Sequence, residues 1–223
     1  MTLLAVAAKD LRLHARDARF LATLALFGLS LTLILSVAFG PLFKDPAREA
    51  SATMWAALFF AGVLGLTRSL ELESESGGGD ALRLTGADAY AVYLGKTIAN
   101  FLLLAALYLL LLPVTAMFFD VSDITMFLPG AGIAALALVG YAAWGTLFAA
   151  LAQGLKGREL LLSILLFPSL IPIWIGAVKL TNALWSGAGV GGVRDWLKIM
   201  GVMDVLGLAL AAWLYEAIQE AGE

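Results

Sequence analysis

Residues 68–96 read RSLELESESGGGDALRLTGADAYAVYLGK, and this stretch is a polar island in an apolar chain. It holds five acids, three bases and three consecutive glycines, whereas 61% of the whole chain is hydrophobic. The flanking segments are long and uncharged, as membrane spans are. A membrane protein whose spans carry no chemistry works through the partner that binds such a loop. Our first hypothesis is that a soluble partner, an ATPase, moves the membrane part through this stretch.

Composition narrows the class of protein further. Only 14% of the residues are charged, against about 25% in soluble domains, and mean hydropathy is +0.93. The absence of cysteine excludes disulfides, Cys-ligated metals and iron–sulfur clusters. A Ser–His–Asp triad would need His14, the single histidine, which lies in a basic leader. We therefore expect no enzyme and no metal site, and a net charge of −3 gives no reason to expect nucleic acid.

Gaps between charged residues mark the spans, since about 20 apolar residues cross a hydrocarbon core of about 30 Å. The predicted fold is an all-α integral membrane protein that forms one transmembrane domain over residues 1–223. A polar loop over 69–95 separates the second and third spans. The six predicted spans are about 20–40, 51–68, 97–119, 131–153, 160–178 and 199–217.

Residues 2–18 are expected to form a helix before the first span. Leu4, Ala8 and Leu11 fall on one face at helical spacing, beside a stripe of bases. Such a helix can lie at the headgroup surface with its apolar face in the lipid. The alternative is a positive flank that only fixes orientation. Val6 and Leu13 lie on the far face, where we expect them to contact another subunit.

The distribution of lysine and arginine predicts the orientation. With the N-terminus inside, nine of these residues lie in cytoplasmic segments and five in outer segments. The excess of inside bases favours cytoplasmic N- and C-termini and places residues 69–95 inside as well.

Spans four to six contain the remaining unusual residues. Span four is rich in small residues and packs closely against another span or a second copy of the chain. In span five, Pro168 and Pro172 produce either a simple kink or a hinge that forms a wall of a transport path. Asp204 in span six is costly in lipid, so we expect it to pair with Lys179 or, alternatively, to contact a substrate.

The sequence Gly95-Lys96-Thr97 resembles the end of a phosphate-binding P-loop, but the rest of that motif is absent. The full P-loop needs a glycine at position 90, which is Tyr90, and a strand before the loop. We interpret these residues as the start of a membrane helix.

Several pieces of the chain resemble one family. Residues 155–175, LKGRELLLSILLFPSLIPIWI, are similar to the signature of the CcmB family, the permease subunit of the haem exporter of cytochrome c maturation. Three further pieces agree with the family pattern in their order along the chain. They are a basic leader before a span ending in Gly40-Pro41, the sequence Trp55-Ala56-Ala57-Leu58, and the loop end Leu94-Gly95-Lys96. Gly86 departs from the pattern, which has a proline there.

The resemblance implies a half-transporter of the ABC-2 type in the bacterial inner membrane. Two copies would stand on a dimer of CcmA-like ATPase subunits, with CcmC-like and CcmD-like membrane proteins and a periplasmic haem chaperone as further partners. The transported or handled ligand would be haem, and ATP would bind the ATPase. Coupling to the ATPase would involve residues of the 69–95 loop and of the 154–159 turn: Glu75, Asp80, Leu82, Arg83, Leu84, Lys156 and Arg158.

Haem bound by this chain would need an axial ligand such as His, Met, Cys or Tyr. The outer half of the predicted bundle has no histidine, and methionines in apolar spans are usually filler. We therefore predict that the chain alone binds no cofactor and that the haem ligands belong to a partner. Candidate hinge or pathway residues are Pro168, Pro172, Trp55, Lys179 and Asp204.

Two other functions fit the same pattern. One is an ABC-2 exporter of another amphipathic substrate, a lipid or a drug. The other is a membrane scaffold that assembles haem-handling proteins without transporting anything.

Overall fold

The computed structural model describes residues 3–39, 45–75, 88–121, 127–152 and 158–220, and within these ranges the chain is helical with no strand. This confirms the all-α class. The elements are α1 (Leu3–Arg16), α2 (Ala18–Phe39), α3 (Pro46–Glu75), α5 (Ala89–Phe118), α6 (Phe127–Ala152), α7 (Arg158–Trp185), the short 3₁₀ helix η3 (Val190–Val193) and α8 (Asp195–Glu220).

Six of these helices are long and apolar enough to cross a membrane: α2, α3, α5, α6, α7 and α8. They contain 22–30 residues, which at 1.5 Å per residue gives about 33–45 Å. Several extend beyond the predicted spans: α3 begins at Pro46 rather than at 51, and α7 continues to Trp185 rather than ending at 178. Charged residues limit the apolar stretch but do not stop a helix, because a long lysine side chain can reach toward the membrane surface.

Aspartates define the starts of three helices. Asp17, Asp45 and Asp88 each accept a hydrogen bond from the backbone N–H three residues later, at 2.9, 3.1 and 2.8 Å. Pro46 follows Asp45 at the first helical position, where its missing N–H costs nothing. The polar residues between the spans therefore cap the helices that follow them.

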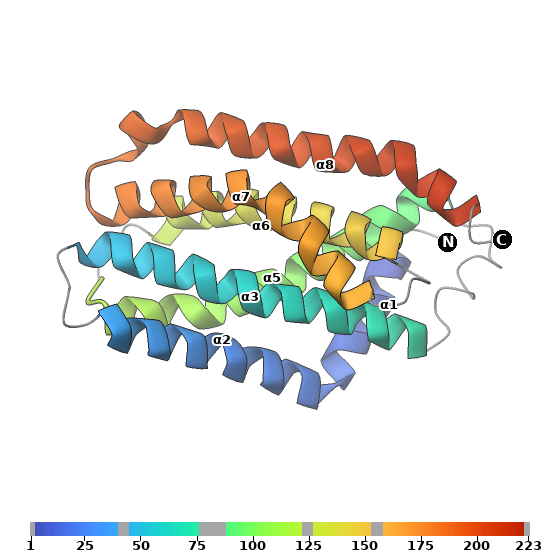
Figure 1. The fold of residues 1–223 in the computed structure, drawn as a ribbon, viewed down its shortest axis with the longest axis horizontal. Helices are drawn as coiled ribbons and strands as arrows, with labels where there is room; N and C mark the ends of the chain where they lie inside the picture. Colours follow the sequence, from blue (N-terminus) through green and yellow to red (C-terminus); the bar gives the residue numbers. More distant parts are fainter. Residues whose placement is uncertain (1–2, 40–44, 76–87, 122–126, 153–157, 221–223) are drawn as a thin grey trace.

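The helices run side by side along the long axis of the molecule (Figure 1). Because the spans alternate in direction, α1, the end of α3, the start of α5 and the end of α8 lie at one end of the bundle, on the right in Figure 1. We call this the polar end. The described ends that flank residues 153–157, namely the end of α6 and the start of α7, lie there too.

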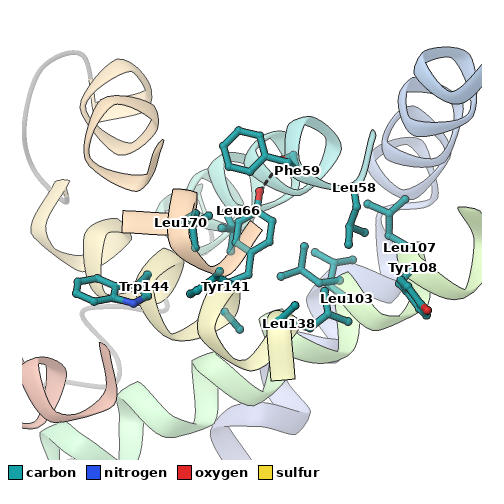
Figure 2. Close-up of a cluster of buried hydrophobic side chains, with 14 of the residues drawn as sticks. Leu58, Phe59, Leu66, Leu103, Leu107, Tyr108, Leu138, Tyr141, Trp144 and Leu170 are labelled. Carbon is teal, nitrogen blue, oxygen red and sulfur yellow. Dashed lines mark hydrogen bonds between the residues drawn. The ribbon is translucent and has the colours of Figure 1, made fainter. Parts of the chain in front are cut away.

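The core lies between α3, α5, α6 and α7, where aromatic and leucine side chains interlock (Figure 2). The Tyr141 hydroxyl on α6 donates a hydrogen bond to the backbone carbonyl of Phe59 on α3. Gly62 leaves room for that ring, since a Cβ there would lie 2.7 Å from the Tyr141 hydroxyl oxygen.

Helix α6 is the centre of the bundle, and residues 140–150 are all buried. It packs against α3, α5, α7 and α8 of the same chain. Of the two expectations for the small residues of span four, the structure favours packing against other spans of this chain. Gly140 and Gly145, for example, face Asp204 and Leu66.

Candidate functional site

The predicted coupling segments begin and end on long helices at the polar end. Glu75 is the last residue of α3, and Arg158 is the first residue of α7. The other predicted coupling residues lie outside the described part of the chain: Asp80, Leu82, Arg83, Leu84 and Lys156. The side chains of Glu75 and Arg158 lie outside it as well. Their coupling role stays a prediction.

The loop predicted over 69–95 is partly helical. Helix α3 continues to Glu75, and α5 begins at Ala89, so both ends of the polar stretch are helical stems. The sequence ELESE contains good helix formers, and polarity ends a membrane span without ending the helix. Any partner that binds residues 76–87 would therefore act directly on α3 and α5.

Helix α1 packs against the start of α5. Val6 is fully buried, and a Cβ at Gly95 would lie 2.7 Å from the Val6 Cβ and 2.9 Å from the backbone oxygen of Leu3. The expectation that Val6 contacts another subunit is wrong: without a side chain at Gly95, α1 approaches α5 of its own chain. Leu4 and Leu11 remain exposed on the opposite face, which leaves them available for lipid.

This contact also explains the sequence Gly95-Lys96-Thr97. All three residues lie inside α5, so their backbone N–H groups are in a helix interior rather than in a phosphate-binding loop. The glycine serves helix packing.

A chain of polar side chains crosses the polar end from α1 to α6. The His14 Nε2 atom lies 2.9 Å from the Ser69 hydroxyl oxygen, which lies 3.4 Å from Asn100 Oδ1. The Asn100 amide donates to the Thr146 hydroxyl at 2.9 Å. We call these four residues the polar relay. The polar relay was not predicted from the sequence, although Asn100 is a polar residue inside a predicted membrane span and could have indicated a buried hydrogen bond.

Burial lowers the pKa of His14, and the nearby Asp10 carboxylate opposes that shift. His14 is 3% exposed, and its Nδ1 atom has no hydrogen-bond partner among the described residues. Asp10 itself pairs with Lys9 at 2.9 Å. A neutral imidazole at pH 7 therefore joins α1 to α3.

Next to the polar relay, Arg68 on α3 ties the start of α2 to α3. Its guanidinium lies 2.8 Å from a Glu71 carboxylate oxygen and 3.5 Å from an Asp17 carboxylate oxygen. The pKa of Asp17 is lowered, first by the hydrogen bond from the Phe20 N–H and then by Arg68. Asp17 is thus ionised while it caps α2.

The predicted pair of Lys179 and Asp204 is wrong. The Lys179 ammonium lies 4.6 Å from the centre of the Trp196 ring, and Trp196 precedes Asp204 by eight residues on α8, about 12 Å along a helix. The Asp204 carboxyl instead lies against Gly140, occupying the space that a side chain there would need. It is 5% exposed, and both oxygens have no hydrogen-bond partner among the described residues.

The family model for the CcmB protein matches residues 1–220. The chain belongs to the CcmB family. This family is that of the haem exporter permease in cytochrome c maturation, and the six apolar helices fit a transmembrane transporter of the ABC-2 type. The comparison with curated proteins found no match.

In this CcmB-family chain, Trp55 is a packing residue of the half of the bundle away from the polar end. Its indole N–H donates to the Thr181 hydroxyl at 3.0 Å, and its ring lies 5.9 Å from that of Tyr108. Trp55 also lines an apolar cavity of about 20 Å³ together with Trp174 and other residues of α3, α6 and α7. That volume would hold about one water molecule and is far too small for haem.

Pro168 and Pro172 both lie inside α7, which continues through them to Trp185. The helix changes direction part-way along its length in Figure 1, and prolines are a known cause of such bends. The kink is therefore present in this CcmB-family chain, and a hinge at the same place stays a prediction.

Proposed function

We propose that this chain is the permease subunit of an ABC transporter complex for haem export or haem-chaperone release, driven by a separate ATPase subunit. Membership of the CcmB family over residues 1–220 carries the proposal. In this proposal ATP binds the partner, and this chain changes shape in response.

The polar end supplies a route by which an ATPase could move the membrane part. Helices α3 and α5 flank residues 76–87, and α6 and α7 flank residues 153–157. The polar relay joins α1, α3, α5 and α6 at this end through three contacts of 2.9–3.4 Å. A push on the α3–α5 stems would therefore reach the central helix α6 and, through it, the packed α7 and α8.

The partners follow from the family and from the charge pattern. A dimer of CcmA-like ATPase subunits would bind two copies of this chain on the cytoplasmic side, where the excess of bases predicts that the polar end lies. CcmC-like and CcmD-like proteins and a periplasmic haem chaperone complete the proposed assembly in the bacterial inner membrane. Haem is the ligand of the complex.

Haem binding by the isolated chain is proposed to be weak or absent. His14 already uses its Nε2 atom in the polar relay and is buried against Phe20, with ring centres 6.0 Å apart. The buried Met54 and Met200 are packed in the core, and Met200 lies against Gly176. A stoichiometric low-spin haem spectrum from the purified chain would contradict this part of the proposal.

The test is complementation of a bacterium whose own CcmB-family permease has been deleted. The wild-type chain should restore covalently haem-bound c-type cytochromes, and the double variant Asp80→Lys/Arg83→Glu should not. The matched control is Asp195→Lys/Lys198→Glu, an exposed ion pair with the same spacing at the opposite end of the bundle, 2.8 Å in length. Failure of the wild type at normal membrane levels would refute the function, whereas equal activity of both double variants would refute only the coupling site.

A further inference from the structure

A groove of about 560 Å³ lies between α2 and α3 at the polar end. Its mouth holds four charged side chains, Asp17, Arg19, Arg68 and Glu71. Its walls farther in are apolar, with Leu24 and Leu64 about seven residues, or about 10 Å, from the mouth on either helix. We call this the α2–α3 groove. Neither the family nor the proposed function assigns it a role.

The charged lining residues of the α2–α3 groove lie at the polar end, and its two leucines lie farther along the helices. Thr23 lies one turn from Arg19, and Thr67 lies one turn from Glu71; their hydroxyls donate to the backbone carbonyls of Arg19 and Val63, at 2.8 and 2.9 Å. These hydroxyls are satisfied by their own helices, so the walls present little free hydrogen-bonding capacity below the mouth. Farther along, Gly65 lets α3 approach Leu24. A ligand with a charged head and an apolar tail matches this gradient.

The charges at the mouth balance one another in number but are separated in space. Arg68 is held between Glu71 and Asp17, so this cluster carries one positive and two negative groups. Arg19 is exposed and forms no ion pair with another described residue. The mouth therefore offers a cation on α2 beside a cluster with an excess negative charge, which is complementary to a dipolar headgroup rather than to a net anion.

We propose that the α2–α3 groove binds one zwitterionic phospholipid with a primary ammonium group, a phosphatidylethanolamine. The phosphate would lie at Arg19, the ammonium would donate hydrogen bonds to the Asp17 and Glu71 carboxylates, and one acyl chain would lie along Leu64. A phosphatidylglycerol lacks the cation for the two acids, and a quaternary phosphatidylcholine cannot donate hydrogen bonds to them. The bound lipid would fasten the start of α2 to α3 beside the polar relay.

The experiment is native mass spectrometry of the full-length chain, delipidated in detergent and titrated with each of the three lipids carrying the same acyl chains. The wild type should bind phosphatidylethanolamine at least about three-fold more than either other lipid. Arg19→Gln/Glu71→Gln should abolish the preference, and Leu64→Trp should lower binding by filling the groove. Arg12→Gln and Leu26→Trp, exposed positions outside the groove, should behave as the wild type does.

Three outcomes would overturn the proposal. Equal binding of all lipids in every variant would mean that only bulk membrane lipid contacts the groove. A preference for phosphatidylglycerol that depends on Arg19 would mean an anionic site. Displacement of phosphatidylethanolamine by one equivalent of haem would make the groove a haem site. Should Leu64→Trp fail to elute as a folded protein, the Arg19→Gln/Glu71→Gln comparison still decides between these results.

Discussion

Replacing Gly95 with alanine tests whether α1 is fastened to α5 by a glycine contact. The added Cβ would lie 2.7 Å from the Val6 Cβ and 2.9 Å from the Leu3 backbone oxygen, and the latter cannot move without moving α1. Overpacking of this kind costs about 1–3 kcal/mol. At about 2 kcal/mol, the ratio of docked to undocked α1 falls roughly 30-fold, since each 1.4 kcal/mol is a factor of ten.

The assay is a spin-label distance measurement, which this cysteine-free chain makes simple because introduced cysteines are the only labelling sites. Labels at Leu4, 73% exposed on α1, and Ile98, 36% exposed on α5, report the docking of α1. Gly95→Ala should broaden the distance distribution and add a long-distance population. Gly201→Ala is the matched control, because a Cβ there meets nothing within 4 Å and the gain in helix propensity is the same. Identical narrow distributions in both variants would refute the argument.

Three further predictions follow from buried groups. Burial lowers the pKa of His14 below 6.5. The docking of α1 should therefore be intact above about pH 6.5 and should weaken as the pH falls through the lower pKa of the folded state. The variant His14→Gln should remove this pH dependence from the same spin-label distances. Gly140→Ala should lower the free energy of unfolding by about 1–3 kcal/mol in SDS titrations, because the added Cβ would meet the Asp204 carboxyl. Adding Asp204→Ala to this variant should recover much of the lost stability. If the effects of the two substitutions were fully additive, the contact would be contradicted. Tyr141→Phe should lower the free energy of unfolding by about 1–3 kcal/mol in the same titration, because the buried Phe59 carbonyl loses its side-chain donor. An unchanged free energy of unfolding would show that this hydrogen bond does not stabilise the fold.

The all-helical fold and the six spans could be predicted because lipid permits few alternatives. A span needs about 20 apolar residues with all backbone groups hydrogen-bonded internally, so charges alone indicate where spans lie. Helix ends were less predictable. Lys179 marked the predicted end of span five, yet α7 continues past it to Trp185, and the Lys179 side chain lies over the Trp196 ring.

Contacts between helices were the least predictable part. The pairing of Lys179 with Asp204 followed from charge alone, but the relative register of α7 and α8 separates them by about two turns of helix. The packing of Val6 on Gly95 and the polar relay through Asn100 depend on which helix faces which, and the patterns of charge and hydropathy do not show this. The prediction of residues that touch the ATPase rests on the family resemblance, and those side chains lie outside the described part of the chain.

The central claim is that a separate ATPase drives this chain through its polar end. The most direct measurement is ATP hydrolysis by the CcmA-like subunit in lipid nanodiscs, with and without the full-length chain. The account predicts that the two proteins co-purify, that the wild-type chain raises the hydrolysis rate several-fold, and that Asp80→Lys/Arg83→Glu removes the increase while Asp195→Lys/Lys198→Glu keeps it. A hydrolysis rate that is the same with and without the chain, in a complex shown to be assembled, would contradict the account.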